Sequence, residues 1–298
     1  MNDHYIRAMS QSGAIRILVC DVTALSAEIC SMQKASATVS IALGRALAAG
    51  ALMGGLLKGT QRVALKYEGN GPMKKLIVEA DAGGAVRGSV GNPEAEAEPV
   101  NGKWNVAGIL GNAGFLTVAK DPGTGAEPYR GTVQLHSSEI GNDLALYLTE
   151  SEQTPSAVGL GASLDSDGDI AICGGFLVQA LPKAEDVEID ALMERIAALA
   201  PISEILAEGG TEGLLAALVG DMPSNRLETR ELYFKCGCTR SKVEQALYLL
   251  GTAGLKSIID NEGVAEVRCE FCRKGYSFDR EELKRFEMLS ALPEEPVQ

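Results

Sequence analysis

Four of the seven cysteines in this 298-residue chain lie in its last quarter, as Cys236-x-Cys238 and Cys269-x-x-Cys272. Two close pairs of thiolates can complete a tetrahedral shell of four sulfurs around zinc, a borderline-soft ion that accepts sulfur ligands. Thirty residues separate the two pairs, so one metal ion would join two distant segments. The spacing therefore predicts that these four cysteines hold one zinc ion.

The segment that carries the cysteines is too small to form a large apolar core. From Glu231 onward it has 68 residues, just below the ~70–80 at which one apolar core is usually sufficient. Zinc binding contributes ~10–16 kcal/mol to the folding of zinc-finger peptides. Residues 231–298 are therefore predicted to form a small C-terminal zinc domain that has four cysteine ligands and depends on its metal.

The same cysteines could respond to oxidants, because oxidants attack thiolates. A disulfide within each pair would close only a short loop and lose the long-range link, so oxidation would release zinc and destabilise the domain. A disulfide between pairs, such as Cys236–Cys269, would keep the link and have the opposite effect. The spacing alone does not choose between these two pairings.

The other three cysteines have a different setting. Cys20, Cys30 and Cys173 lie in the apolar stretches RILVCDV, SAEICSM and DIAICGG. Free cysteine is commonly a small buried hydrophobic residue, so these three are predicted to be unreactive core residues. The N-terminal MNDHYIRAMSQSG lacks the apolar core of a secretory signal, which favours a cytoplasmic protein in which clustered thiols serve metal or redox chemistry.

Residues 1–182 mix strand and helix signals and are predicted to form an α+β core domain. GAIRILVCDV is typical of a strand. The apolar stretch 35–57 is interrupted by Arg45, which favours a buried core helix over a membrane span. Three hairpins are predicted from paired strand patterns: 74–93, the stretch from GFLTVAKD to GTVQL, and the stretch from SAVGLG to FLVQALP with a turn near Asp167-Gly168.

Residues 183–230 lack strand signals and are predicted to form a helical linker. Apolar residues recur at steps of three and four from Ile189 to Leu199, which indicates one amphipathic face. Pro201, the Gly209-Gly210 pair and Pro223 divide the segment into short helices. Because short helices depend on docking against a neighbour, this linker is predicted to be metastable.

A zinc ribbon that binds nucleic acid is the main alternative function. The chain carries a net charge of -13, which opposes binding to phosphate backbones or anionic membranes. Residues 236–276 contain six Lys and Arg against five Asp and Glu, and zinc with four thiolates adds a charge of -2. The module would be neutral to acidic, so neither nucleic acid nor a membrane is predicted as a partner.

No catalytic residue is predicted. The two histidines, His4 and His136, lie near no nucleophile motif, and no G-K-[ST] phosphate loop occurs. A thiol oxidoreductase would place Cys269 at the start of a helix, whereas VAEVRC is strand-like. LDSDGDIAI has glycine at the wrong position for a calcium loop. The protein is therefore not expected to be an enzyme.

Longer stretches resemble one known family, the bacterial redox-regulated heat-shock holdases called 33 kDa chaperonins. The cysteine motifs in YFKCGCTRSKVEQALYLLG and VRCEFCRKGYSF carry the most specific part of the likeness. RGSVGNP, GFLTVAKD, PYRGTVQL, SEQTPSAVGLG and GGFLVQALP extend it in the same order over nearly the whole chain. The family usually has serine after the first motif, where this chain has Thr239.

The resemblance implies a redox-switched, ATP-independent chaperone. The reduced form would be an idle monomer with one zinc held by Cys236, Cys238, Cys269 and Cys272. Oxidation would form the disulfides Cys236–Cys238 and Cys269–Cys272, release zinc, and unfold the C-terminal domain and then the linker. The oxidised form would be a homodimer that binds unfolding client proteins. The sequence assigns no residues to client binding.

Overall fold

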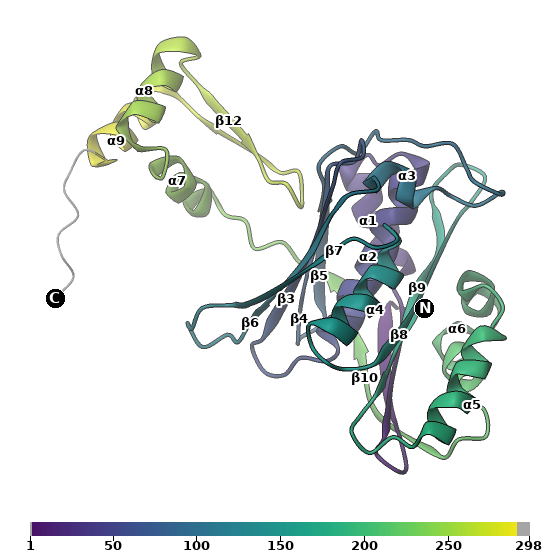
Figure 1. Cartoon of the computed structure of the whole chain (residues 1–298). Helices are drawn as coiled ribbons and strands as arrows, with labels where there is room; N and C mark the ends of the chain where they lie inside the picture. The colour runs from purple at the N-terminus through teal and green to yellow at the C-terminus, as the bar shows by residue number, and fades with distance from the viewer. Residues whose placement is uncertain (1, 291–298) are drawn as a thin grey trace. The chain divides into compact units, whose positions relative to one another are not determined.

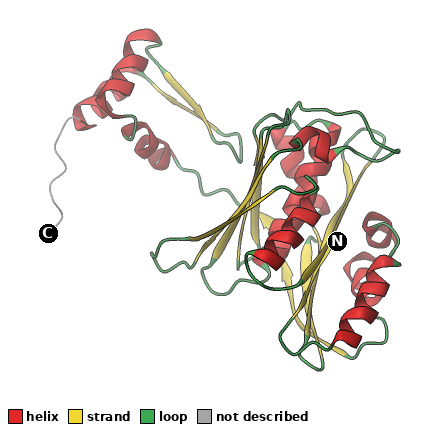
Figure 2. Cartoon of the chain, viewed as in Figure 1, coloured by secondary structure: helices red, strands yellow, loops and turns green. Residues whose placement is uncertain are grey.

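The structure, a computed structural model, describes residues 2–290 and divides into two units (Figure 1). The first unit is Met1–Lys235 and the second is Cys236–Gln298. Helices and strands occur in both units (Figure 2). The chain therefore has the α+β class that its sequence predicts.

A five-stranded antiparallel sheet, in the order β10-β1-β2-β9-β8, forms one layer of the first unit. Its strands are β1 (His4–Ser10), β2 (Ile15–Asp21), β8 (Ser156–Leu164), β9 (Ile170–Ala180) and β10 (Ser224–Glu231). β2 is the strand expected from GAIRILVCDV. β8 and β9 form the hairpin predicted near Asp167-Gly168, where Gly168 has the positive φ of 88° that the turn requires.

A six-stranded sheet, in the order β11-β5-β4-β3-β6-β7, forms a second layer. Its strands are β3 (Arg62–Gly69), β4 (Lys75–Asp81), β5 (Ala85–Val90), β6 (Gly114–Asp121), β7 (Tyr129–Gln134) and β11 (Tyr233–Phe234). All neighbours are antiparallel except β11, which pairs in parallel with β5. The predicted hairpins β4–β5 and β6–β7 are confirmed.

Helix α2 (Ala37–Gly54) contacts strands of both sheets and forms the centre of the main core (Figure 1). α1 (Thr23–Gln33), α3 (Val106–Leu110) and α4 (Ile140–Glu150) pack beside it. A Cβ at Gly50 would lie 2.4 Å from the Val78 side chain, so this glycine permits the close approach of α2 to β4. α2 is long and apolar enough to cross a membrane, yet 89% of it is buried inside the first unit. The predicted core helix is confirmed.

Helices α5 (Asp186–Ala197) and α6 (Ile202–Val219) cover the other face of the five-stranded sheet. The faces of β2 alternate as a pleated strand requires: Leu18 and Cys20 join the main core, whereas Ile17 and Val19 join the core beneath α5 and α6. Gly210 interrupts α6 with φ 58° and ψ -157°, which agrees with the break predicted at the glycine pair.

Residues 224–231 correct one sequence expectation, since this part of the supposed helical segment is strand β10. β10 pairs with β1 along its length, from His4 opposite Glu231 to Ser10 opposite Ser224. Its sequence, SNRLETRE, lacks alternating apolar residues because β10 is an exposed edge strand. Backbone pairing rather than side-chain burial therefore specifies this strand, and backbone pairing leaves no hydropathy signal.

The second unit contains helices, one hairpin and a small core. Its elements are α7 (Arg240–Tyr248), α8 (Gly251–Asn261), β12 (Ala265–Arg268), β13 (Gly275–Phe278) and α9 (Arg280–Ser290). Its buried apolar residues are Leu247, Leu255, Ile259, Ala265, Tyr276, Phe278, Leu283 and Phe286. So few buried side chains agree with the expectation that this unit needs a further staple.

Candidate metal centre

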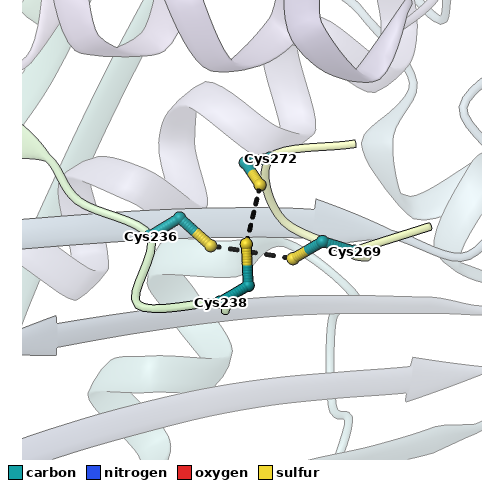
Figure 3. Close-up of side chains that lie close together, drawn as sticks. All are labelled: Cys236, Cys238, Cys269 and Cys272. Atoms are coloured by element: carbon teal, nitrogen blue, oxygen red, sulfur yellow. Dashed lines mark hydrogen bonds between the residues drawn. The ribbon is translucent and has the colours of Figure 1, made fainter. Parts of the chain in front are cut away.

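The four predicted ligands come together in the second unit (Figure 3). Cys236 and Cys238 lie in the loop that leads into α7, and Cys269 and Cys272 lie in the turn between β12 and β13. Their Sγ atoms all lie within 4.8 Å of one another, and each residue is half-buried. Two segments far apart in the sequence thus present four sulfurs to one point.

The sulfur geometry fits a tetrahedral zinc site. The Sγ atoms of Cys236 and Cys269 are 3.6 Å apart, and those of Cys238 and Cys272 are 3.3 Å apart. A zinc ion with Zn–S bonds of about 2.3 Å separates its tetrahedral sulfurs by about 3.8 Å. Four thiolates at these distances would repel one another without a cation between them. The donor set and its spacing therefore suit one zinc ion.

The turn that carries the second pair is fixed by its backbone. The N–H of Cys269 donates to Lys274 O, and the N–H of Arg273 donates to Cys269 O, each at 3.0 Å. Arg273 adopts a positive φ of 58°, which lets the chain reverse directly after Cys272. These bonds aim both sulfurs of the pair to the same side.

The loop that carries the first pair is held from the start of α7. The Thr239 hydroxyl caps this helix by accepting from the N–H of Lys242, at 3.3 Å. The Lys242 amino group donates to Gly237 O at 2.8 Å, between the two cysteines of the pair. Thr239, where the family usually has serine, thus performs the capping role that either hydroxyl can fill.

Tyr276 on β13 supplies a hydrogen bond that the sequence analysis does not anticipate. Its hydroxyl donates to the Sγ of Cys238 at 3.2 Å. This bond is the main cause that lowers the pKa of Cys238 to about 7, and it raises the pKa of Tyr276 to about 12. A tyrosine four residues after a cysteine carries no distinctive signal in one sequence, so only the hairpin geometry reveals the contact.

The second pair lies in a less polar setting. Desolvation raises the pKa of Cys272 to about 12 and also raises that of Cys269. Without a cation, these thiols would stay protonated at neutral pH. A bound zinc ion would keep all four sulfurs deprotonated, because the metal binds the thiolate form.

Cys20, Cys30 and Cys173 lie apart from the metal centre, in the first unit. All three are buried in the main core beside α2, as the sequence predicts. Burial raises the pKa of Cys30 and of Cys173 to about 12 and raises that of Cys20 well above its usual value. Such thiols have little thiolate to offer an oxidant.

Comparisons with known proteins agree with these features. The family model described as Hsp33 protein matches residues 3–279. The 33 kDa chaperonin of Pelobacter propionicus is 64% identical over 95% of this chain and 93% of its own length. That of Geobacter sulfurreducens is 52% identical over 96% and 95%, respectively.

A solved structure supports the same assignment. The crystal structure of the 33 kDa chaperonin from Thermotoga maritima superposes with a TM-score of 0.89 at 32% identity, over 97% of this chain and 99% of that chain. These names give no support to the nucleic-acid-binding alternative. With a four-cysteine centre in a small C-terminal unit and relatives matched along nearly their whole length, the chain belongs to the Hsp33 family of redox-regulated chaperones.

Proposed function

We propose that this protein is an ATP-independent holdase, idle while Cys236, Cys238, Cys269 and Cys272 hold one zinc ion and active after their oxidation. The observation that carries the proposal is the convergence of four sulfurs within 4.8 Å in a unit with only a small core of its own. No catalytic turnover is proposed, because the cysteines serve as sensors of the oxidant.

Oxidation within each pair accounts for the switch. When bound, zinc supplies a crosslink between the two cysteine segments and holds their sulfurs as thiolates. Each pair would give two electrons to one molecule of peroxide, which takes up two protons and leaves as two waters. The products are the disulfides Cys236–Cys238 and Cys269–Cys272, neither of which joins the two segments.

Loop length explains why these disulfides do not replace the metal. A disulfide within a pair closes a loop of three or four residues, worth about 2 kcal/mol by chain entropy. A disulfide between Cys236 and Cys269 would span 33 positions and would be worth about 4 kcal/mol. Both values fall below the ~10–16 kcal/mol of a structural zinc, but only the longer link would keep the two segments together.

The linker would then expose an apolar surface to clients. α5 and α6 cover a patch of the five-stranded sheet that includes Ile6, Ile17, Val19, Phe176 and Val178. Against this patch the two helices place four buried apolar side chains, Leu192, Leu206, Leu214 and Leu218, and several that are only partly buried. We propose that residues 183–230 are metastable, that α5 and α6 detach after the zinc domain unfolds, and that unfolding proteins bind the uncovered patch.

The same proposal covers assembly and location. The family resemblance implies a monomer when reduced and a homodimer when oxidised. A switch that rests in the thiol state needs a compartment that keeps thiols reduced, which favours the cytoplasm. The net charge of -13 and the burial of α2 favour protein clients over nucleic acid or membrane.

Parallel measurement of zinc release and client aggregation tests this function. Reduced, zinc-loaded protein is heated mildly with peroxide, zinc is followed with a coloured chelator, and light scattering follows a heat-denatured client. Zinc release and suppression of aggregation should rise together, and a thiol reductant with zinc should reverse both. If the reduced zinc form holds clients as well as the oxidised form, the redox switch is wrong.

A further inference from the structure

Arg240, two residues after Cys238, makes more contacts than a surface arginine needs. We propose that Arg240 is a side-chain latch that holds the first cysteine pair against β13 and α9 and so sets how readily oxidant opens the metal centre. The proposal rests on the proposed function for its physiological meaning, but its contacts and its test concern the second unit alone.

All three guanidinium nitrogens of Arg240 have partners. Nη1 donates to the backbone oxygen of Ser277 at 3.0 Å, and Nη2 contacts Glu282 Oε1 at 2.7 Å. Nε lies 3.4 Å from Glu244 Oε1, one turn further along α7. The fork geometry of arginine makes this combination possible, and a lysine could not reproduce it.

The guanidinium also lies over an aromatic ring. Its Cζ is 4.2 Å from the ring centroid of Phe278, a fully buried residue at the end of β13. Phe278 in turn packs edge-on against Phe286 of α9, with ring centroids 5.7 Å apart. One side chain next to the metal centre is thereby connected to the middle of the small core.

The position of Arg240 in its helix is unfavourable for a cation, so the contacts with other elements must compensate for it. Arg240 is the first residue of α7, where the positive end of the helix dipole disfavours a cation. Glu282, in the first turn of α9, compensates that charge, and its other oxygen accepts from the N–H of Asp279. The pair therefore joins the starts of two helices beside the sulfurs.

The latch affects oxidation through access. The four cysteines are half-buried, so movement of the first cysteine pair away from the hairpin would expose the sulfurs further to peroxide. Arg240 opposes that movement without any contribution from the metal. Exposed ion pairs alone are weak, but here a carbonyl hydrogen bond and a cation–π contact act together with the ion pair.

Three variants measure the latch in the full chain. Arg240→Gln should release zinc under peroxide about tenfold faster than the parent at one temperature, which corresponds to ~1.4 kcal/mol of opening free energy. Arg240→Lys keeps the positive charge but loses the forked guanidinium, so its rate of zinc release should lie between those of the parent and Arg240→Gln. Arg285→Gln is the matched control, because Arg285 is exposed on α9 and no partner of its side chain is seen in residues 2–290.

A second readout needs no oxidant. Amide hydrogen exchange of α7 in the reduced, zinc-loaded protein should quicken about tenfold in Arg240→Gln and stay unchanged in Arg285→Gln. A double-mutant cycle with Glu282→Gln should be non-additive, because the two side chains are direct partners. Glu282→Gln alone also serves if Arg240→Gln does not fold.

The possible outcomes separate the latch from the proposed function. The latch is wrong if Arg240→Gln releases zinc and exchanges its amides at the rates of the parent protein. It is also wrong if the effects of Arg240→Gln and Glu282→Gln are strictly additive. Neither result affects the proposed holdase function. If the oxidised parent fails to hold clients, the proposed function is wrong, whereas faster exchange in Arg240→Gln would still support the latch.

Discussion

At the scale of single residues, the sequence identifies the ligands, and the structure adds the residues that tune them. Four thiols in two close pairs form a spacing pattern, and a spacing pattern can be read without coordinates. The hydroxyl of Tyr276 reaches Cys238 only because the hairpin of β12 and β13 turns it that way. Arg240 likewise gains its role from Ser277, Phe278 and Glu282, which lie about forty positions away.

Replacement of Tyr276 by phenylalanine tests the hydrogen bond to the metal centre. Loss of an outer-shell partner typically costs 10–100-fold in metal affinity, so Tyr276→Phe should bind zinc about tenfold more weakly in competition with a chelator. Tyr248→Phe is the control, because that tyrosine packs its ring on Phe286 and lies outside the centre. Equal zinc affinity for both variants would remove Tyr276 from the site.

The thiols of Cys20, Cys30 and Cys173 should not react with a thiol reagent under native conditions. In reduced protein freed of zinc by a chelator, a thiol reagent should label the four cysteines of the second unit quickly, because that unit unfolds without its metal. It should label all seven only in denaturant, since Cys20, Cys30 and Cys173 are buried in the core of the first unit. Mass spectrometry of the labelled peptides assigns each site. Rapid native labelling of any of these three residues contradicts their assignment to the core.

At the scale of elements, burial decides what the sequence can predict. The hairpins and the core helix α2 have a side-chain pattern and could be predicted. β10 falls within a segment predicted to be helical, because an exposed edge strand needs no apolar alternation. β3 does alternate, with Val63, Leu65 and Tyr67 buried, so a closer search for period-two patterns could have found it.

Replacing each of the two adjacent glycines in α6 by alanine should have opposite effects on the stability of the helix. A Cβ on Gly209 meets no atom within 4 Å, so Gly209→Ala should stabilise the helix by about 0.5–1 kcal/mol. Gly210 has φ 58° and ψ -157°, so Gly210→Ala should cost about 1–3 kcal/mol. If detachment of the linker limits activation, Gly209→Ala should slow the gain of client holding and Gly210→Ala should hasten it, by up to about fivefold per kcal/mol.

Rates of aggregation suppression after a fixed peroxide treatment provide that comparison, and zinc release provides its control. Zinc release should be the same in both glycine variants, because the metal centre lies in the other unit. Identical activation rates in the two variants would argue that α6 stays docked during activation.

At the scale of the whole molecule, the two units differ in what stabilises them. The first has a large core around α2 and a second core under α5 and α6, whereas the second unit, as described through Ser290, has eight buried apolar residues and the cysteine centre. Removal of the metal should therefore unfold the second unit and leave the main core around α2 folded.

Chelation of zinc from the reduced protein tests this division. The second unit should melt tens of degrees lower without zinc, because the metal supplies on the order of 10 kcal/mol to a small domain. Trp104, the single tryptophan, lies in the first unit, so its fluorescence should report a transition that moves little, while circular dichroism follows both units. A single thermal transition with the same midpoint with and without the chelator would contradict this division between the units.

The central claim is that oxidation within pairs opens a clamp that zinc closes between pairs. The short sulfur distances, Cys236 to Cys269 and Cys238 to Cys272, both cross between the pairs, so proximity alone does not select the proposed disulfides. The most direct test is a disulfide map, by mass spectrometry, of the oxidised fraction that holds clients. The account predicts Cys236–Cys238 and Cys269–Cys272, and a dominant Cys236–Cys269 or Cys238–Cys272 link in the active fraction would contradict it.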